Sequence, residues 1–224
     1  KINRLLLGEV QAYAKANGMT VVGEEYTPLG STDFATIVGK VKSSGADAVF
    51  NTLNGDSNVA FFKEYTNVGL KAATLPVLSV SIAEEEVQGI GAANIVGQLT
   101  AWNYYETIDT PVNKKFVADF KKMYGEKRVT SDPMEAAYTS LYLWKNTVEK
   151  AKSFAVADIQ KAAGGVSFDA PEGTVTINGE NHHIAKTALI GEIHDDGLIY
   201  TVWSSGKPIE PDPFLKGYAW AKGL

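Results

Sequence analysis

The chain has 224 residues, of which 45% are hydrophobic and 21% are charged, and its formal net charge at pH 7 is −5. This is the profile of a globular protein with one large domain or two modest ones. The net negative charge argues against a basic surface that would attract nucleic acid or an anionic membrane. The absence of cysteine excludes disulfide bonds, thiolate metal sites and cysteine nucleophiles.

The first predicted element is an amphipathic helix at the start of the chain. Its apolar face, recognised by the helical spacing, carries Ile2, Leu5, Leu6, Val10 and Tyr13. Gly18 lies where this helix would end. No capping residue and no strand precede Ile2. We therefore expect the chain to be the later part of a longer two-lobed protein, with one strand of its sheet missing before this helix.

Strands and helices alternate from this helix to about residue 105. The predicted strands cover residues 19–28, 46–53, 74–81 and 93–105. The predicted helices between them cover residues 31–45, 54–70 and 83–91. Strands that alternate with helices indicate βαβ units and a parallel sheet, so the predicted fold class is α/β.

The pattern changes after residue 108, where helices are predicted at about residues 112–124, 133–151 and 155–163. Asp132 is expected to cap the second of these helices, with Pro133 at its first position, and Asp109-Thr110-Pro111 is a similar start for the first. Apolar stripes on the first two helices comprise Phe116, Val117, Phe120, Tyr138, Leu141, Trp144 and Val148. Three short helices can bury only part of such stripes, so we expect an open apolar patch and a tendency to aggregate if this chain is expressed alone.

Strands return at about residue 166, and Asp196-Gly197 between two apolar runs is a strong hairpin signal. The Pro-rich, aromatic end of the chain is expected to lie over a surface of the protein. The predicted organisation is therefore an α/β unit, a set of helices, a β-hairpin region and a tail. These units cover residues 1–105, 106–165, 166–205 and 206–224.

Several stretches together resemble the type I periplasmic binding proteins of the branched-chain amino acid class. They are "IDTPVNKKFVADFKKMYG", "DPMEAAYTSLYLW", "FDAPEGTVTINGENHH" and "SSGKPIEPDPF". The branch that these stretches resemble most is that of the urea and short-chain amide binders of ATP-driven transporters. A cytoplasmic amide-sensing regulator belongs to the same branch.

The resemblance implies a protein about twice this length, with two Rossmann-like α/β lobes, three crossovers and a ligand held in the cleft between the lobes. Residues 1–105 and 166–205 would then be the second lobe, and residues 106–165 would be helices that return to the first lobe. The sheet of the first lobe and the first strand of the second lobe would be absent from this chain.

Polar residues follow the predicted strands, where ligands of open α/β sheets bind. After the strand at 46–53, Thr52, Asn54 and Asp56 could supply both acceptors and donors to a flat, uncharged solute such as urea. The alternative is ordinary turn chemistry, with Asp56 or Ser57 as the cap of the next helix.

Ser79 and Ser81 end the following strand and point to the same side of an extended chain. The resemblance places Ser81 nearest to a hydroxyl residue that faces the ligand. Ser81 and Glu84 also have the spacing of a capping box, so Ser81 could cap the next helix. The three glutamates at 84–86 are interpreted as a solvated first turn favoured by the helix dipole.

Tyr104 and Tyr105 lie at the end of the fourth strand and point in opposite directions in an extended chain. We expect one of them to face the cleft and the other to face the core, and the resemblance favours Tyr104 near the ligand. The predicted ligand-binding residues are therefore Asn54, Ser81, Tyr104, Ser79 and Asp56.

We predict no metal site, no cofactor and no catalysis. Adjacent residues on a strand point in opposite directions, so His182 and His183 cannot easily share one metal ion. The sequence contains no Gly-rich phosphate loop, no G-x-S-x-G and no H-E-x-x-H motif.

The predicted function is that of the substrate-binding component of an ABC importer, which captures urea or a small amide by hinge closure of two lobes. Its partners would be the small neutral amide, the ABC permease in the membrane and the missing N-terminal part of the same protein. Its location would be periplasmic, or extracellular with a lipid anchor. The alternative is a cytoplasmic regulator of the same fold that senses amides.

Overall fold

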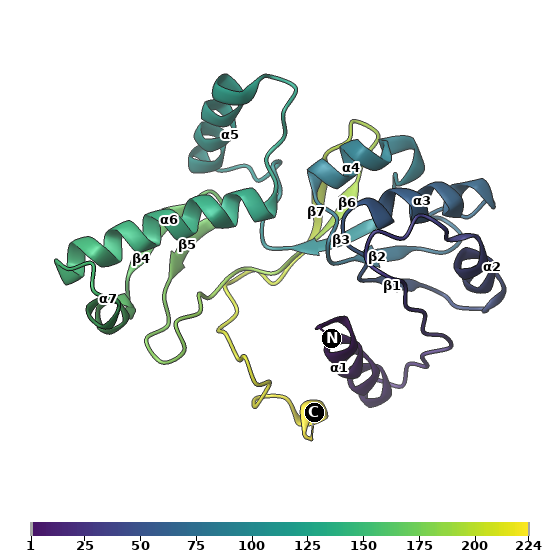
Figure 1. The fold of residues 1–224 in the computed structure, drawn as a ribbon, viewed down its shortest axis with the longest axis horizontal. Coiled ribbons are helices and arrows are strands. Elements are labelled where there is room, and N and C mark those ends of the chain that lie inside the picture. The colour runs from purple at the N-terminus through teal and green to yellow at the C-terminus, as the bar shows by residue number, and fades with distance from the viewer. Residues whose placement is uncertain (1, 224) are drawn as a thin grey trace.

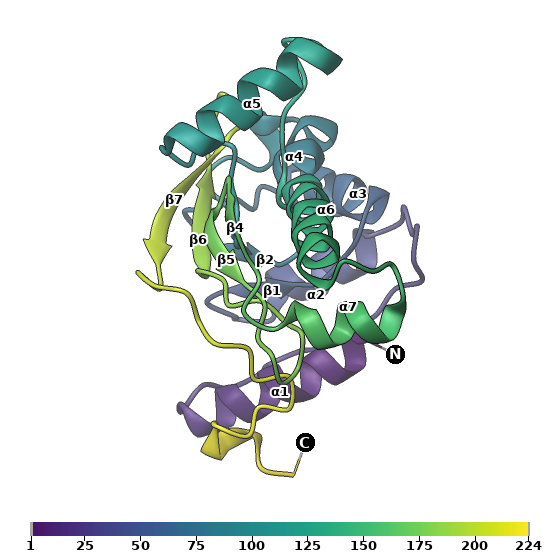
Figure 2. The same cartoon turned by 90° about the vertical axis from the view of Figure 1, so that its left-hand side faces the viewer.

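The computed structural model describes residues 2–223, with side chains described from residue 8 onward. Two parts lie side by side (Figure 1). The part that we call the sheet lobe comprises residues 2–102 and 189–204. The part that we call the helical lobe comprises residues 111–176. The orthogonal view shows the first helix, α1 (Ile2–Ala16), and the C-terminal end of the chain next to each other, below the sheet (Figure 2).

The first half of the sheet lobe follows the predicted alternation of helices and strands. Its elements are α1 (Ile2–Ala16), α2 (Ala35–Ser43), β1 (Val49–Asn51), α3 (Asp56–Asn67), β2 (Val77–Ser79), α4 (Glu84–Ile90), the 3-10 helix η1 (Ala92–Asn94) and β3 (Leu99–Trp102). β1, β2 and β3 are parallel, and the order of the five-stranded sheet is β1-β2-β3-β6-β7. The α/β fold and the parallel pairing predicted from the sequence are therefore confirmed.

Aromatic side chains of α3 form the core of the sheet lobe. Phe61, Phe62 and Tyr65 recur at helical spacing, so one face of α3 packs against the sheet, and all three are buried. Val38 of α2 and Val77 of β2 belong to the same apolar cluster. The hydroxyl of Tyr65 donates a hydrogen bond to the carbonyl of Leu75, so this polar group is satisfied inside the core.

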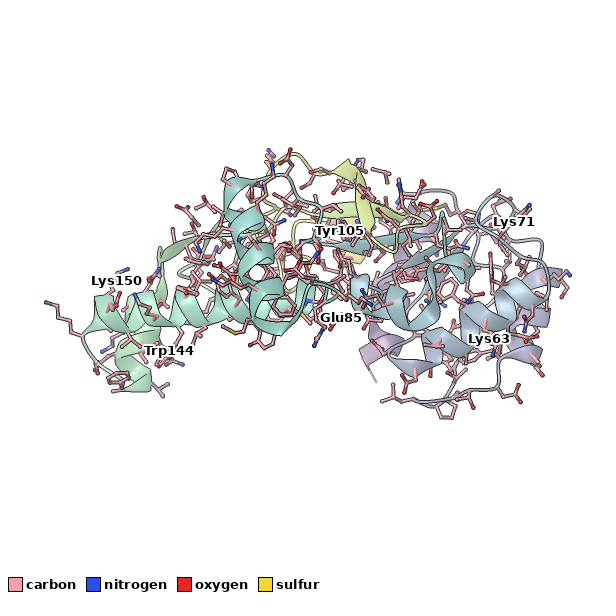
Figure 3. All side chains as sticks on the ribbon, turned by 90° about the horizontal axis from the view of Figure 1, so that it is seen from above. Lys63, Lys71, Glu85, Tyr105, Trp144 and Lys150 are labelled. Carbon is pink, nitrogen blue, oxygen red and sulfur yellow. The ribbon has the colours of Figure 1, made fainter. Side chains whose placement is uncertain are left out.

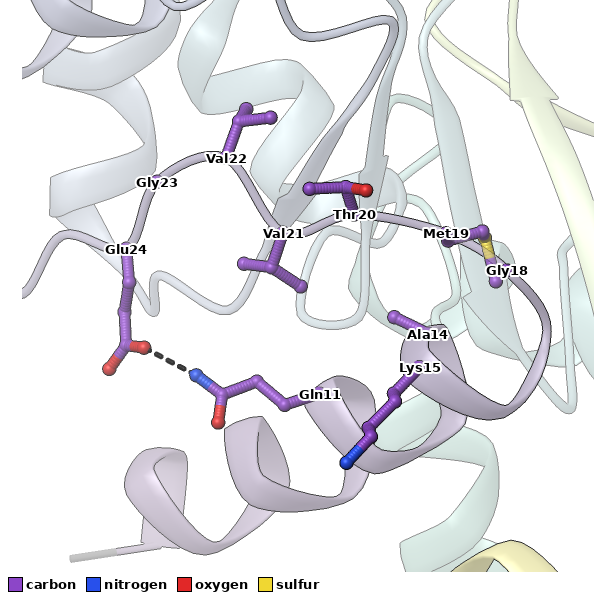
Figure 4. A pocket seen from close by; sticks show the side chains of 10 residues that line it. All are labelled: Gln11, Ala14, Lys15, Gly18, Met19, Thr20, Val21, Val22, Gly23 and Glu24. Atoms are coloured by element: carbon purple, nitrogen blue, oxygen red, sulfur yellow. Dashed lines mark hydrogen bonds between the residues drawn. The ribbon is translucent and has the colours of Figure 1, made fainter.

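The strand predicted at residues 19–28 does not form, and this part of the sequence interpretation is wrong. The segment runs past α1 without regular secondary structure, and Val21 and Val22 are 43% and 55% exposed. A strand requires a neighbour for its backbone groups, and the described sheet ends at β1. The segment and α1 instead enclose a hollow of about 640 Å³ (Figure 4), closed at one end by a 2.7 Å hydrogen bond from Gln11 Nε2 to Glu24 Oε2.

The predicted missing strand before α1 stays a prediction. In the described residues, β1 has a partner strand on one side only, and Val21 and Val22 are exposed. Of the predicted apolar face of α1, the side chains of Ile2, Leu5 and Leu6 lie outside the described residues.

The three consecutive helices are confirmed as α5 (Pro111–Tyr124), α6 (Asp132–Ala151) and α7 (Val156–Ala163). Thr110 caps α5 as expected, since its Oγ1 accepts a hydrogen bond of 3.1 Å from Asn113 N. The predicted cap of α6 is corrected, because Ser131 is the N-cap residue and Asp132 lies inside the first turn. The carboxylate of Asp132 instead accepts a hydrogen bond of 3.0 Å from the backbone N–H of Asn103.

Half of the apolar stripe predicted on α6 faces outward, whereas Tyr138 and Val148 are half-buried. Leu141 and Trp144 are 61% and 48% exposed, and Phe154 beside them on the way to α7 is 76% exposed. The buried face of the helix instead carries Glu135, Thr139, Leu143 and Thr147. Residues three and four apart share a helix face, so these four residues lie on one face of α6. This is the buried face of the helix. The open apolar patch expected on these helices is therefore present in this chain.

The region 166–205 is not one β-hairpin unit, which corrects the predicted domain boundaries. It contains two hairpins in different lobes: β4 (Ser167–Ala170) with β5 (Gly173–Thr176), and β6 (Leu189–Ile193) with β7 (Ile199–Ser204). The first pair forms its own two-stranded sheet, whereas β6 pairs antiparallel with β3. The reason is the packing of α6, where Tyr142 stacks on Phe168 with ring centroids 4.7 Å apart. The hairpin turn at Asp196-Gly197 between β6 and β7 is confirmed.

The tail after residue 205 lies over α1, as a tail laid on a surface was expected to do. Trp220 of the short 3-10 helix η2 (Ala219–Ala221) contacts the ring of Tyr13 edge to face, with centroids 5.5 Å apart. Within residues 2–223, no helix is both long and apolar enough to cross a membrane.

Candidate functional site

The loops that follow β1, β2 and β3 emerge at the carboxyl edge of the parallel strands, where an open α/β sheet places its ligand. Asn54 lies exposed in the first of these loops, and its Nδ2 donates a 3.2 Å hydrogen bond to the carbonyl of Thr52. Asp56 is exposed at the start of α3. Both residues are therefore open to a solute at this edge.

The cap predicted for α3 is corrected. The N-cap residue is Gly55, with φ of 59°, and no side chain caps the helix. Asp56 and Ser57 lie inside the helix, and the buried hydroxyl of Ser57 has no hydrogen-bond partner within the described residues. Since the first N–H groups of a helix have no intrahelical acceptor, the start of α3 presents unused donors at this edge.

Ser79 belongs to a buried hydrogen-bond network below the edge. Asn51 Nδ2 donates to Ser79 Oγ at 3.0 Å and to Asn58 Oδ1 at 2.9 Å, and Asn51 Oδ1 accepts from Leu53 N at 2.8 Å. This network ties β1, β2 and α3 together, and Ser79 is 1% exposed. Asn51 and Asn58 could not be predicted as members of this network, because an asparagine inside a predicted strand or helix does not indicate its hydrogen-bond partners.

Ser81 joins the loops after β1 and β2, because its hydroxyl donates a hydrogen bond to the carbonyl of Leu53. It does not cap α4. The N-cap residue is Ala83, whose N–H donates to Glu86 Oε2 at 2.9 Å. Since the Ser81 side chain is only half-buried, it can both position the loop of Asn54 and reach the edge of the sheet.

Both tyrosines after β3 are completely buried, so the expectation that one of them faces the cleft is corrected for this structure. The Tyr104 hydroxyl lies 2.8 Å from both Asn113 Oδ1 and Thr130 Oγ1, on the side of the helical lobe. The Tyr105 hydroxyl donates to the carbonyl of Thr100 at 2.7 Å. Burial raises the pKa of both phenols, so both remain protonated donors.

The structure thus brings four of the five predicted ligand residues to one edge of the sheet. Asn54, Asp56 and Ser81 are accessible there, and Ser79 supports them from below. Tyr104 lies at the same end of the strands, but its side chain packs between the lobes. The role of these residues in binding a ligand stays a prediction.

A group of buried carboxylates at the junction of the two lobes was missed by the sequence analysis. The interpretation of residues 84–86 as a solvated turn is wrong for Glu84, which is 0% exposed. Its Oε1 accepts a hydrogen bond of 2.7 Å from the backbone N–H of Glu106. Burial is the main cause that raises the pKa of Glu84 to about 8, and the nearby charges of Glu106 and Asp132 add to it.

The other carboxylates of this group accept hydrogen bonds or form ion pairs. Glu106 accepts from Thr130 N at 2.6 Å and forms an ion pair of 2.5 Å with Lys121. Lys186 forms an ion pair of 2.8 Å with Glu172, whose pKa is raised to about 7, mainly by burial. These contacts could not be predicted from sequence patterns, because the donors and the carboxylates are distant from each other in the sequence.

No three histidine, aspartate or glutamate side chains in the described part of the chain are arranged to hold a metal ion. His182 and His183 lie in the turn after β5, where His183 Nδ1 is 2.9 Å from the carbonyl of Asn181.

Comparison with known proteins assigns the fold to a family. The model of the family described as "Periplasmic binding protein domain" matches residues 4–219. The chain belongs to this family. A relative named "Leu/Ile/Val-binding protein homolog 6" from Brucella melitensis is 30% identical over 212 residues, which cover 92% of this chain and 54% of the relative.

Two solved structures with similar folds carry aromatic acids. One is a solute-binding protein of an ABC transporter from Rhodopseudomonas palustris HaA2 in complex with p-hydroxybenzoic acid, with a TM-score of 0.79 and 28% identity. The other is an R. palustris solute-binding protein in complex with 4-hydroxybenzoate, with a TM-score of 0.79 and 29% identity. Each match covers 91% of this chain and 56% of the solved chain.

The chain therefore spans about half the length of the relatives that it matches. The resemblance to type I periplasmic binding proteins is confirmed at the level of the family. The finer assignment to the urea and short-chain amide branch is not supported, because these relatives are named for branched-chain amino acids and hydroxybenzoic acids.

Proposed function

We propose that this chain forms part of the solute-binding component of an ABC importer, located in the periplasm and working with a membrane permease. The observation that carries the proposal is the open carboxyl edge of β1 and β2, where Asn54 and Ser81 meet the uncapped start of α3. The relatives reported above are binding proteins rather than enzymes, so the proposed role is capture of a solute. A further part of the protein would supply the opposite wall of the cleft.

The solute that fits this edge best is a small organic carboxylate, either an amino acid or an aromatic acid. The N–H groups at the start of α3 and the positive end of its dipole favour a carboxylate, and the exposed carboxylate of Asp56 in the same turn favours an ammonium group next to it, as in an amino acid. The side-chain amide of Asn54 adds a donor next to them. Two relatives above 25% identity bind hydroxybenzoic acids, which carry such a group.

Calorimetric titration of the intact protein with 4-hydroxybenzoate, leucine and urea tests this assignment. We expect saturable binding of at least one carboxylate and no binding of urea. Binding of urea alone would overturn the assignment of a carboxylate solute and would support the short-chain amide predicted from the sequence. Turnover of any of the three solutes would contradict a pure binding role.

Replacing Asn54 by alanine is expected to weaken binding of the solute found in that titration by about 1–3 kcal/mol, because a buried ligand group would lose its partner. The matched control is Asn67→Ala. Asn54 lies just before the start of α3, whereas Asn67 is exposed at the C-terminal end of α3, away from the carboxyl edge of the sheet. Equal affinity of Asn54→Ala and Asn67→Ala would remove Asn54 from the site.

A further inference from the structure

The segment that leads from the sheet lobe into the helical lobe is held by one carboxylate from each lobe. Glu84, at the start of α4, accepts the N–H of Glu106 at 2.7 Å. Asp132, at the start of α6, accepts the N–H of Asn103 at 3.0 Å through Oδ2. The two acceptors thus fix residues 103–106 from opposite sides, which is the arrangement of a pivot between two bodies.

Outside this pivot, the same two elements are joined by weaker surface contacts. Glu85 accepts from the Ser131 hydroxyl at 3.2 Å and lies 3.7 Å from the guanidinium of Arg128. Gln88 Nε2 donates to the carbonyl of Lys127 at 3.5 Å. Figure 3 shows Glu85 in the middle of the molecule, at the boundary between the two lobes. Exposed contacts of this kind contribute little energy, so the buried carboxylates dominate the joint.

We propose that Glu84 is a proton-sensitive pivot: its neutral carboxyl keeps the two lobes in the arrangement seen here, and its ionisation loosens the joint. Glu84 is 0% exposed, and its Oε2 has no hydrogen-bond partner within the described residues. A negative charge there would be buried without a cation, which is costly unless water enters. The proposal does not depend on which solute the protein binds.

The charges around Glu84 also oppose its ionisation, whereas the hydrogen bond from the N–H of Glu106 favours the ionised form but does not outweigh burial. Glu106 from the crossover and Asp132 from α6 both oppose a negative charge on Glu84, and Glu85 and Glu86 follow it on α4. The nearby cations are already paired with other acids: Lys121 with Glu106, Arg128 with Glu85 and Lys186 with Glu172. Opening the joint to water is therefore the available way to stabilise the ionised form.

These 224 residues contain no cysteine, so two labels can be placed in them without removing a thiol of this chain. Lys63→Cys on α3 and Lys150→Cys at the end of α6 are exposed positions at opposite ends of the molecule (Figure 3). Spin labels at both positions of the intact protein report the distance between the lobes by pulsed electron paramagnetic resonance. We expect a narrow distance distribution at about pH 6.5 and a broader or shifted one at about pH 9.5, with circular dichroism unchanged.

The variant Glu84→Gln keeps the size of the side chain and removes its titration, so its distance distribution should not change with pH. Glu126→Gln, at an exposed residue between α5 and α6, should respond as the parent does. The proposal is overturned if the parent distribution is the same at both pH values, or if Glu84→Gln responds equally. Difference infrared titration tests the proposal without a mutation at Glu84. It should show a buried carboxyl that ionises over the same pH range in which the distance between the labels changes. If every carboxyl ionises below about pH 6, the proposal is also overturned.

Discussion

The free energy of unfolding is expected to decrease as the pH rises from about 5 to about 8, by a few kcal/mol. The cause is the group of buried carboxyls between the lobes. Burial is the main cause that raises the pKa of Glu84 to about 8 and that of Glu172 to about 7, and it also raises the pKa values of Asp132 and Glu135. Each of these groups holds its proton more tightly in the folded than in the unfolded protein.

The sign follows from proton linkage. Between the unfolded and folded pKa values, the folded state binds more protons, so raising the pH through this window favours unfolding. Carboxyls with lowered pKa values act only at lower pH: Asp196 is stabilised mainly by the Tyr200 hydroxyl, and Asp212 mainly by the backbone N–H of Gly217. Their contribution is lost as the pH falls through their folded pKa values. We therefore expect maximum stability at mildly acidic pH.

Guanidinium chloride denaturation followed by tryptophan fluorescence at a series of pH values measures this dependence, and it avoids urea, which was a predicted ligand. Glu84→Gln should flatten the curve between about pH 5 and pH 8, because it removes the carboxyl whose pKa burial raises to about 8, compared with about 7 for Glu172. Stability that rises with pH across this range would show that the carboxyls are solvated or paired in solution.

Much of the fold could be predicted because it depends on local patterns. The three consecutive helices were found from their spacing, and the first two also from Pro at their starts: α5 begins at Pro111 after the Thr110 cap, and Pro133 lies in the first turn of α6. The hairpin at Asp196-Gly197 was found from its turn residues alone. The strand at 19–28 failed because β-branched residues form a strand only when another strand pairs with them, and the described sheet offers none beyond β1.

The residues of the candidate site that follow from the strand topology could be predicted, whereas those that depend on burial by distant segments could not. Asn54 and Ser81 could be placed at one edge, since parallel strands end on the same side of a sheet. Glu84 could not be told from Glu85 and Glu86, because all three occupy the first turn of one helix. Glu84 is the one of the three that accepts a hydrogen bond from the segment between the lobes, at Glu106, and that is completely buried. No local sequence pattern indicates this contact.

Gly191 is the position where we expect the most damaging small substitution. A Cβ atom at this residue of β6 would lie 2.4 Å from Ile199 Cγ2 and 2.8 Å from the ring of Tyr105. Both neighbours are fully buried, so neither can move away without disturbing the core. The glycine therefore allows the Tyr105 ring to pack directly on the sheet and to fix the start of the crossover between the lobes. Gly191→Ala should destabilise the protein by about 1–3 kcal/mol or more.

The matched control is Gly39→Ala in α2, where an added Cβ would meet no atom within 4 Å. Alanine is favoured over glycine inside a helix by about 0.5–1 kcal/mol, so this variant should be more stable than the parent. Thermal and chemical denaturation of the two variants should thus move in opposite directions from the parent. If Gly191→Ala unfolds at the same denaturant concentration as Gly39→Ala, the Tyr105 ring does not pack on β6 in solution, and the start of the crossover is not fixed by this contact.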